Sequence, residues 1–346
     1  MTDSALPRLA ITLGDVAGIG PEVVVRALAD ESIRAVCQPV VIGDETILQR
    51  TANCLGLTSS LDGIEKVVVT TPGLGDVKLG TIDARAGAAA FDCLTTAINL
   101  ALSGQVDGIV TAPLNKYALH LAGHDYPGHT EILAERCGVR EFAMMLYVPS
   151  STDIPVCEPP VCQPAGIKGP HGLAVAHTTL HTSIASVPGL LSQDRIADTI
   201  KLTNSFLRRV GCDAPRVGVC ALNPHAGEDG LFGDEEARLI RPAVESLQQT
   251  GINAQGPLPA DTLIKRAVDG EFDGIVAMYH DQGHIPLKLI AFGHAVNVTL
   301  GLPITRTSPS HGTAFDIAAR YEANPTGMLE AIRVAARLSQ TPPPAA

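Results

Sequence analysis

The sequence predicts an α/β protein built from two lobes. Short runs of β-branched and aliphatic residues alternate with longer amphipathic patterns along the chain, and this alternation is typical of parallel βαβ units. A chain of 346 residues exceeds what one hydrophobic core usually supports, so two α/β lobes are expected rather than one. Hydrophobic residues make up 45% and charged residues 18% of the chain, which excludes intrinsic disorder.

The first part of the chain is expected to supply strands with helices between them. The run 9–13 looks like a buried strand, and Pro21 then stands in the first turn of a helix, where its missing N–H has no partner to lose. A helix is also expected from His129 to about residue 137. Further strands are predicted at 39–42, 66–70 and 108–111, with helices ending near residue 55 and spanning 84–103.

The second part continues the alternation after an interruption. Residues 149–172 are rich in Pro, Cys, Ser and Gly without periodicity, so we expect an irregular insertion whose role is open. Helices after Gly312 and Gly327 are expected to close the chain. Strands are predicted at 142–148, 173–176, 216–221 and 276–278, helices at 193–210 and 235–249, and a turn at 256–262.

The composition excludes several classes of function. The net charge of −11 and the absence of a Lys/Arg-rich run argue against nucleic-acid binding. The eight cysteines lack CxxC spacing, which indicates reduced thiols, and the state of Cys157 and Cys162 is left open. There is no signal-peptide pattern and no apolar run of about 18 residues. We therefore expect a cytoplasmic protein without a membrane span.

Histidines follow three of the predicted strands. One histidine in such a place is more often structural, but His181, His225 and His280 recur at strand ends, where open α/β sheets build their sites. Three neutral imidazoles suit a divalent metal with open coordination positions. The sequence therefore predicts a catalytic metal site.

Three other segments are candidates for binding anions or cofactors. His129 and Thr130 follow Pro-Gly at a helix start, which favours an anion site, although Thr130 as a simple helix cap is the alternative. Lys288, Asn297 and Arg306 precede the run 311–313, which is expected to open a helix. Three glycines from residue 14 onwards have the spacing GxxxGxG, which differs from the Rossmann fingerprint GxGxxG. These glycines could let the backbone approach a ligand closely, and a tight strand-to-helix turn explains them equally well.

Long motifs in this order resemble the 4-hydroxythreonine-4-phosphate dehydrogenase family, the pyridoxal phosphate biosynthesis proteins and their catabolic paralogues. The resemblance covers nearly the whole chain except the 149–172 insertion and the tail. It implies two α/β lobes around a cleft, as in isocitrate and isopropylmalate dehydrogenases, with 1–130 plus 300–346 in the first lobe. Residues 131–299 would form the second lobe, with the metal site and the dimer interface. The motifs are 15–22, 111–116, 127–131, His181, 223–228, 256–262, 279–283 and 301–314.

The resemblance also implies an activity. Members are NAD(P)-dependent dehydrogenases acting on CH–OH that need one divalent metal ion (Zn, Mg, Co, Ni or Mn) and work as homodimers with a shared active site. The first candidate reaction belongs to pyridoxine biosynthesis. In it, 4-hydroxythreonine 4-phosphate is oxidised to the 3-oxo acid and decarboxylated to 3-amino-2-oxopropyl phosphate.

Site residues are carried over from the family position by position. His280 is expected to come from the partner subunit, and Asp261 receives an acid/base or orienting role, with a helix cap as its alternative. The full set is metal-binding His181, His225 and His280; substrate-binding His129, Thr130, Lys288, Asn297 and Arg306; catalytic Asp261 and His280; and cofactor-binding Gly14, Asp15, Gly18, Ser310 and His311.

Departures from the family pattern suggest a paralogue with a different substrate. Val16 replaces a usual Pro, Pro309 and Ser310 replace Val-Asp near the expected cofactor site, and the 149–172 insertion is extra. One alternative is a D-threonate or D-erythronate 4-phosphate dehydrogenase, because His284 at this position resembles the sequence of those relatives. Another alternative is a dihydrodiol-dicarboxylate dehydrogenase. From a different class, a non-catalytic metal or phosphate binder and a metal hydrolase are the remaining alternatives.

Overall fold

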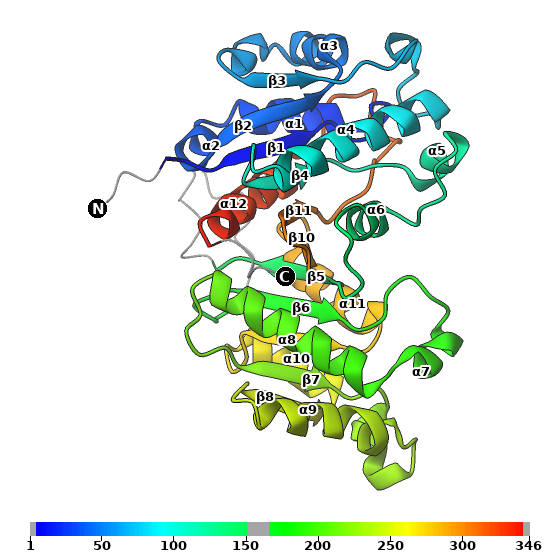
Figure 1. Ribbon diagram of the computed structural model, residues 1–346, viewed down its shortest axis with the longest axis vertical. Coiled ribbons are helices and arrows are strands. Elements are labelled where there is room, and N and C mark those ends of the chain that lie inside the picture. The colour runs from blue at the N-terminus through cyan, green and yellow to red at the C-terminus, as the bar shows by residue number, and fades with distance from the viewer. Residues whose placement is uncertain (1–4, 151–165, 342–346) are drawn as a thin grey trace. The chain divides into compact units, whose positions relative to one another are not determined.

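The computed structural model describes residues 5–150 and 166–341 (Figure 1). The chain divides into two compact units, Met1–Arg140 with Leu302–Ala346, and Glu141–Gly301. The expected boundary after residue 130 falls inside α6 (His129–Arg136), whereas the division found lies beyond this helix. Most of the expected irregular insertion, with Cys157 and Cys162, lies outside the described residues.

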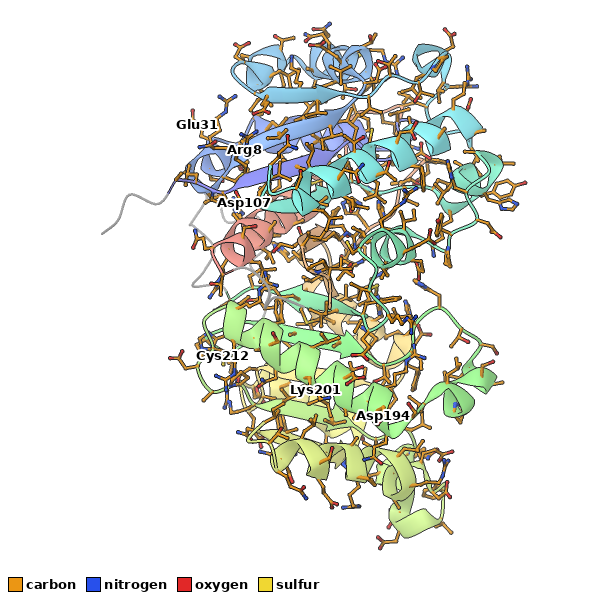
Figure 2. The ribbon with its side chains drawn as sticks, viewed as in Figure 1. Arg8, Glu31, Asp107, Asp194, Lys201 and Cys212 are labelled. Carbon is orange, nitrogen blue, oxygen red and sulfur yellow. The ribbon has the colours of Figure 1, made fainter. Side chains whose placement is uncertain are left out.

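Parallel strands in the order β3-β2-β1-β4-β11 form the sheet of the first unit. Its strands are β1 (Arg8–Thr12), β2 (Gln38–Gly43), β3 (Glu65–Val68), β4 (Gly108–Thr111) and β11 (Thr305–Pro309). Figure 2 shows Arg8 and Asp107 at the starts of β1 and β4, where the Arg8 N–H donates to the Asp107 carboxylate at 2.7 Å. The first four strands were predicted within two residues, and β11 was not predicted.

Helices cover both faces of this sheet. Ile109 of β4 packs in a core with residues of α4 (Ala84–Leu102) and α6. Val110 faces the opposite side because side chains alternate along a strand. Its neighbour Thr307 donates a hydrogen bond at 2.7 Å to the Ala331 carbonyl of α12 (Thr326–Ser339), so α12 covers that side. The other helices are α1 (Gly20–Leu28), α2 (Glu31–Val36), α3 (Glu45–Leu55) and α5 (Lys116–Leu121).

The helix predicted after Gly312 is wrong. Residues 310–325 form turns, with Ala314 and Tyr321 in the left-handed region at φ of 44° and 53°. Phe315 packs against a buried cluster that includes Val16. This long-range packing overrides the local helical spacing, and the first regular helix after β11 is α12.

The sheet of the second unit is mixed, in the order β10-β5-β6-β9-β7-β8. β5 runs antiparallel to both β10 and β6, while the remaining pairs are parallel. Part of the turn predicted at 256–262 is instead the end strand β8, a position where Pro257 is tolerated. The strands are β5 (Ala143–Val148), β6 (Leu173–His177), β7 (Val217–Cys220), β8 (Ala254–Leu258), β9 (Gly274–Ala277) and β10 (Val296–Leu300).

Helices cover both faces here as well. Leu146 of β5 belongs to a core shared with α10 (Ala260–Val268) and α11 (His280–Ala291). The next residue, Tyr147, meets Phe206 of α8 (Gln193–Arg209) edge-on at 5.0 Å, so α8 covers the opposite face, as Figure 1 also shows. The helix predicted at 235–249 is a π-turn at Glu236–Ile240 continued by α9 (Arg241–Gln248). In the described parts of the chain, no helix has the length and apolar character needed to cross a bilayer.

Candidate active site

The ends of β6 and β9 bring two of the predicted metal ligands together. These strands are parallel neighbours, and the Thr179 hydroxyl beyond β6 donates to the Met278 carbonyl beyond β9 at 2.8 Å. The loops tied in this way carry His181 and His280, whose ring centres lie 5.6 Å apart. One chain therefore brings both imidazoles near each other, and the expectation that His280 serves the site of a partner subunit stays a prediction.

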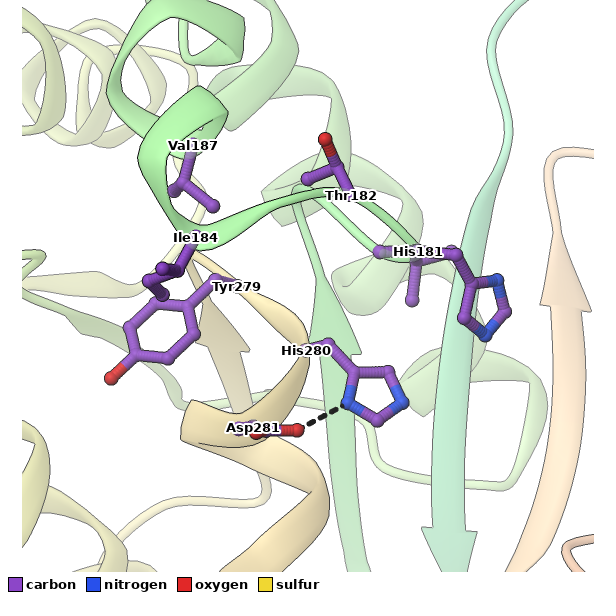
Figure 3. Close-up of a pocket in the computed structure, with 8 residues that line it drawn as sticks. His181, Thr182, Ile184, Val187, Tyr279, His280 and Asp281 are labelled. Atoms are coloured by element: carbon purple, nitrogen blue, oxygen red, sulfur yellow. Dashed lines mark hydrogen bonds and ion pairs between the residues drawn. The ribbon is translucent and has the colours of Figure 1, made fainter.

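Both histidines line a cavity of about 280 Å³ (Figure 3). The Asp281 carboxylate lies 2.6 Å from Nδ1 of His280. Because a carboxylate only accepts, His280 carries its proton on Nδ1 and keeps the lone pair of Nε2 for a metal. Figure 3 shows the Tyr279 ring beside Ile184, apart from the two imidazoles.

The two imidazoles fit a divalent metal. Rings that share a tetrahedral ion with bonds of about 2 Å have centres roughly 5 Å apart, close to the 5.6 Å found. Among the described residues, the ring of His225 lies near Phe232, with ring centres 6.4 Å apart, and makes no ring contact with His181 or His280. Within the described residues, no group of three His, Cys, Asp or Glu side chains is placed to hold a metal. The third ligand therefore stays a prediction.

Two buried side chains that the sequence analysis did not single out hold the strand ends in place. Gln282 accepts from the Met278 N–H and donates to the Ala221 carbonyl, both at 2.7 Å, and so joins the ends of β9 and β7. Glu236 accepts from the N–H groups of Leu222 and Asn223 at 2.8 Å, which anchors the loop that carries His225. Only the tertiary contacts reveal these roles.

A buried pair of histidines lies behind His280. His284, one turn later in α11, stacks on His280 with ring centres 3.8 Å apart and planes 11° apart. Nδ1 of His284 lies 3.0 Å from Nε2 of His177, whose Nδ1 lies 3.3 Å from the Met144 carbonyl. The pKa of His177 is lowered to about 4 and that of His284 to about 2, mainly by burial and in part by the charges of neighbouring histidines. Both rings are therefore neutral at pH 7.

Arg306 is the largest fully buried side chain of the first unit. It pairs with Ile109 in the sheet and so faces α4 and α6, where its Nη2 donates to the Thr111 hydroxyl at 2.7 Å. Burial lowers the pKa of Arg306 to about 9, and the Glu131 carboxylate opposes this shift. The guanidinium thus remains charged at neutral pH in a place that water scarcely reaches.

The start of α6 lies beside this guanidinium. The helix begins after Gly128 with no side-chain cap, so Thr130 does not cap it. Burial, followed by the charges of Arg306 and Lys116, holds the pKa of His129 well below its ordinary value. A neutral imidazole, two cations and free helix N–H groups form a site suited to an anion.

The remaining expected substrate residues and Asp261 lie in the second unit. Lys288 stands one turn after His284 in α11, and its charge lowers the pKa of that histidine. Asn297 of β10 has a buried side-chain oxygen without a hydrogen-bond partner among the described residues. Asp261 is exposed, and its carboxylate accepts from the Thr262 N–H at 2.8 Å. This contact is typical of a helix start, and a catalytic role for Asp261 stays a prediction.

The glycines of the expected cofactor site are explained by packing within the protein. Gly14 has a φ of 64°, and a Cβ atom there would lie 2.3 Å from the Pro113 carbonyl oxygen. A Cβ atom on Gly18 would lie 2.7 Å from the Thr313 carbonyl oxygen. The glycine turn therefore packs against the loop that follows Ser310 and His311, and no ligand is needed to account for either glycine.

Two buried groups of this region have unusual ionisation. Asp15 accepts from the Ala17 N–H at 2.9 Å with one carboxylate oxygen, while the other is buried without a partner among the described residues. Burial raises the pKa of Asp15 to about 6. Burial also lowers the pKa of His311, whose Nε2 has no partner among those residues. Both side chains have unused hydrogen-bonding capacity for a bound cofactor.

Comparisons with known proteins identify the family of this chain. Residues 35–335 match the family model of the pyridoxal phosphate biosynthetic protein PdxA. The chain is 41% identical to a D-threonate 4-phosphate dehydrogenase of Pectobacterium atrosepticum, over 96% of this chain and 99% of the relative. It is 42% identical to a 4-hydroxythreonine-4-phosphate dehydrogenase of Geobacter metallireducens, over 96% of each chain.

A solved structure shows the same fold. The 4-hydroxythreonine-4-phosphate dehydrogenase of Klebsiella pneumoniae superposes with a TM-score of 0.80 at 40% identity, covering 96% of this chain and all of that one. The resemblance in the sequence motifs is thereby confirmed. The chain belongs to the PdxA family and is a dehydrogenase of that family, which implies NAD or NADP as cofactor.

Proposed function

We propose that this chain oxidises a four-carbon hydroxy acid that carries a 4-phosphate, with NAD or NADP and a divalent metal. The observation that carries the proposal is the buried guanidinium of Arg306 beside the start of α6. The charge of Lys116 adds to that of Arg306 at His129, and the carboxylate of Glu131 acts in the opposite direction on Arg306. Burying the guanidinium charge is costly unless anionic groups compensate it, and a phosphate matches a guanidinium in charge and geometry.

The histidines of the second unit would hold the divalent metal. His181 and His280 are the metal ligands, His225 is the third candidate, and Asp281 keeps Nε2 of His280 available. A divalent metal held there would lower the pKa of the substrate hydroxyl, and the nicotinamide would accept the hydride from the same carbon and be reduced. The products are a 3-oxo acid and a proton, and loss of carbon dioxide from that acid follows. The homodimer remains part of the proposal.

Local charge favours a second hydroxyl over an amine beside the oxidised carbon. Lys288 lies close enough to His284 to lower its pKa, and the carboxylate of Asp281 is already engaged by Nδ1 of His280. An ammonium group would have to lose its proton before it could bind beside a metal and a lysine, whereas a hydroxyl binds as it is. We therefore place D-threonate 4-phosphate first, with its stereoisomer D-erythronate 4-phosphate, and 4-hydroxythreonine 4-phosphate second, because named relatives act on each.

A substrate panel tests the proposal. Purified protein with added divalent metal is given the three phosphorylated acids and an unphosphorylated dihydrodiol dicarboxylate, with NAD or NADP, and reduced nicotinamide is measured. We expect the highest kcat/KM with D-threonate 4-phosphate. A preference for 4-hydroxythreonine 4-phosphate would overturn the charge argument alone, and turnover of only the dicarboxylate would overturn the phosphate site.

A further inference from the structure

We propose that His284, held by His177, is a positioning residue that fixes the ring of His280. The inference rests on the proposed metal-dependent function, because it gives the buried pair a task at the metal. It depends on contacts within the second unit only.

With both rings neutral, the contacts of the pair allow one arrangement of protons. The Met144 carbonyl can only accept, so His177 donates with Nδ1. A neutral His177 then has a lone pair on Nε2, and the 3.0 Å contact requires His284 to donate with its own Nδ1. This arrangement turns both contacts into hydrogen bonds while both rings stay neutral. The His284 ring is thereby fixed in orientation and tautomer.

Close packing of α11 on β6 creates the pair. A Cβ atom on Gly283 would lie 2.5 Å from Nε2 of His177 and 2.7 Å from Cγ1 of Val175. A larger residue at 283 would push the helix away from the strand and separate the two rings. The glycine therefore lets His284 reach His177 with one edge while its face lies on His280.

Two contacts together hold His280 in one orientation. Asp281 fixes which nitrogen carries the proton, and the stacked ring of His284 limits rotation of the imidazole. Groups that orient a metal ligand in this way commonly change metal affinity by about 10- to 100-fold when they are removed. We expect an effect of this size from the loss of the His284 ring.

The proton arrangement is tested on metal-free protein. Full-length chain labelled with ¹⁵N-histidine is recorded in a two-bond ¹H–¹⁵N correlation spectrum, with His177→Phe and His284→Phe variants assigning the signals. We expect both rings to carry their proton on Nδ1. Protonation of His284 on Nε2, or an imidazolium signal from either ring at pH 7, would overturn the pairing whatever the activity of the enzyme.

The positioning role is tested by titrating the metal-free protein with Co²⁺ in a calorimeter. His284→Leu should weaken binding by about 10- to 100-fold, His284→Phe should retain more affinity because it keeps a stacked ring, and the exposed His120→Leu serves as control. Affinity of His284→Leu within twofold of wild type, or His284→Phe as weak as His284→Leu, contradicts the role. If His284→Leu does not fold, the Co²⁺ affinities of His284→Phe and His177→Phe are compared instead. Absence of Co²⁺ binding by the wild type would instead refute the proposed function.

Discussion

Replacing Arg306 with Met should weaken phosphate binding without lowering the stability of the fold. The pKa of this guanidinium falls to about 9 because it is buried. One pKa unit corresponds to about 1.4 kcal/mol, so burial from the ordinary value of 12.5 costs the charged form roughly 5 kcal/mol. This cost is present in full below pH 9 and fades as the pH rises from 9 towards the unfolded value, because only the folded state has then lost the proton.

The substitution removes that cost together with one hydrogen bond. The bond to Thr111 contributes about 1.5–3 kcal/mol, so Arg306→Met should unfold with a free energy equal to wild type or up to about 3 kcal/mol higher. The same variant loses the charge-assisted hydrogen bonds to phosphate. Two such bonds at about 1.5–3 kcal/mol each correspond to a KM for the phosphorylated acid at least about 100-fold higher. The KM for NAD should not change.

Chemical denaturation and steady-state kinetics measure the two effects, and Arg216→Met is the matched control. Arg216 pairs at 2.9 Å with Asp273, whose side chain is 2% exposed. Its removal leaves a buried carboxylate unpaired, so that variant should lose about 3–5 kcal/mol with an unchanged KM. An Arg306→Met protein that is several kcal/mol less stable and binds substrate normally would refute the assignment of Arg306 to a phosphate site.

Three further substitutions follow from the structure. Asp15→Asn should stabilise the protein by about 3 kcal/mol above pH 6 and by nothing near pH 4. The reason is that the raised pKa of Asp15 destabilises the fold only where the unfolded carboxyl has ionised. Equal differences in the free energy of unfolding at both pH values, measured by urea titration, would contradict this. Asp281→Ala should lower Co²⁺ affinity about 10-fold or more while stability changes by under about 1 kcal/mol, and unchanged affinity would remove the carboxylate from the metal site. Gln282→Leu leaves the Met278 N–H and the Ala221 carbonyl without a partner, so denaturation should show a loss of about 2–4 kcal/mol, and a neutral effect would show that water replaces the amide.

Local pattern was sufficient for the apolar strands and failed where tertiary contacts decide the structure. β1 and β4 are continuous apolar runs buried on both faces, and the sequence predicts them within one residue. β11 reads as a polar loop because the partners of Arg306 and Thr307 are distant in sequence. α11 has a Gly and Pro286 inside it, which are signals against a helix, although the packing on β6 requires that glycine.

The candidate site was predictable to the extent that it depends on strand order. Histidines after neighbouring parallel strands meet at one edge of a sheet, and His181 and His280 do so. The depth of Arg306 and the bridging by Gln282 arise from contacts between residues far apart in the chain. No spacing rule reports such contacts, so these features needed the structure.

One measurement decides whether this dehydrogenase needs both the substrate's phosphate and a divalent metal. It compares initial rates with D-threonate 4-phosphate and with D-threonate, before and after removal of divalent metal. NAD reduction is followed with the wild-type protein at equal concentrations of the two acids. We expect turnover of the phosphorylated acid alone, lost on chelation and restored by added Co²⁺. Equal rates for the two acids, or full activity of metal-free protein, would contradict the proposed function.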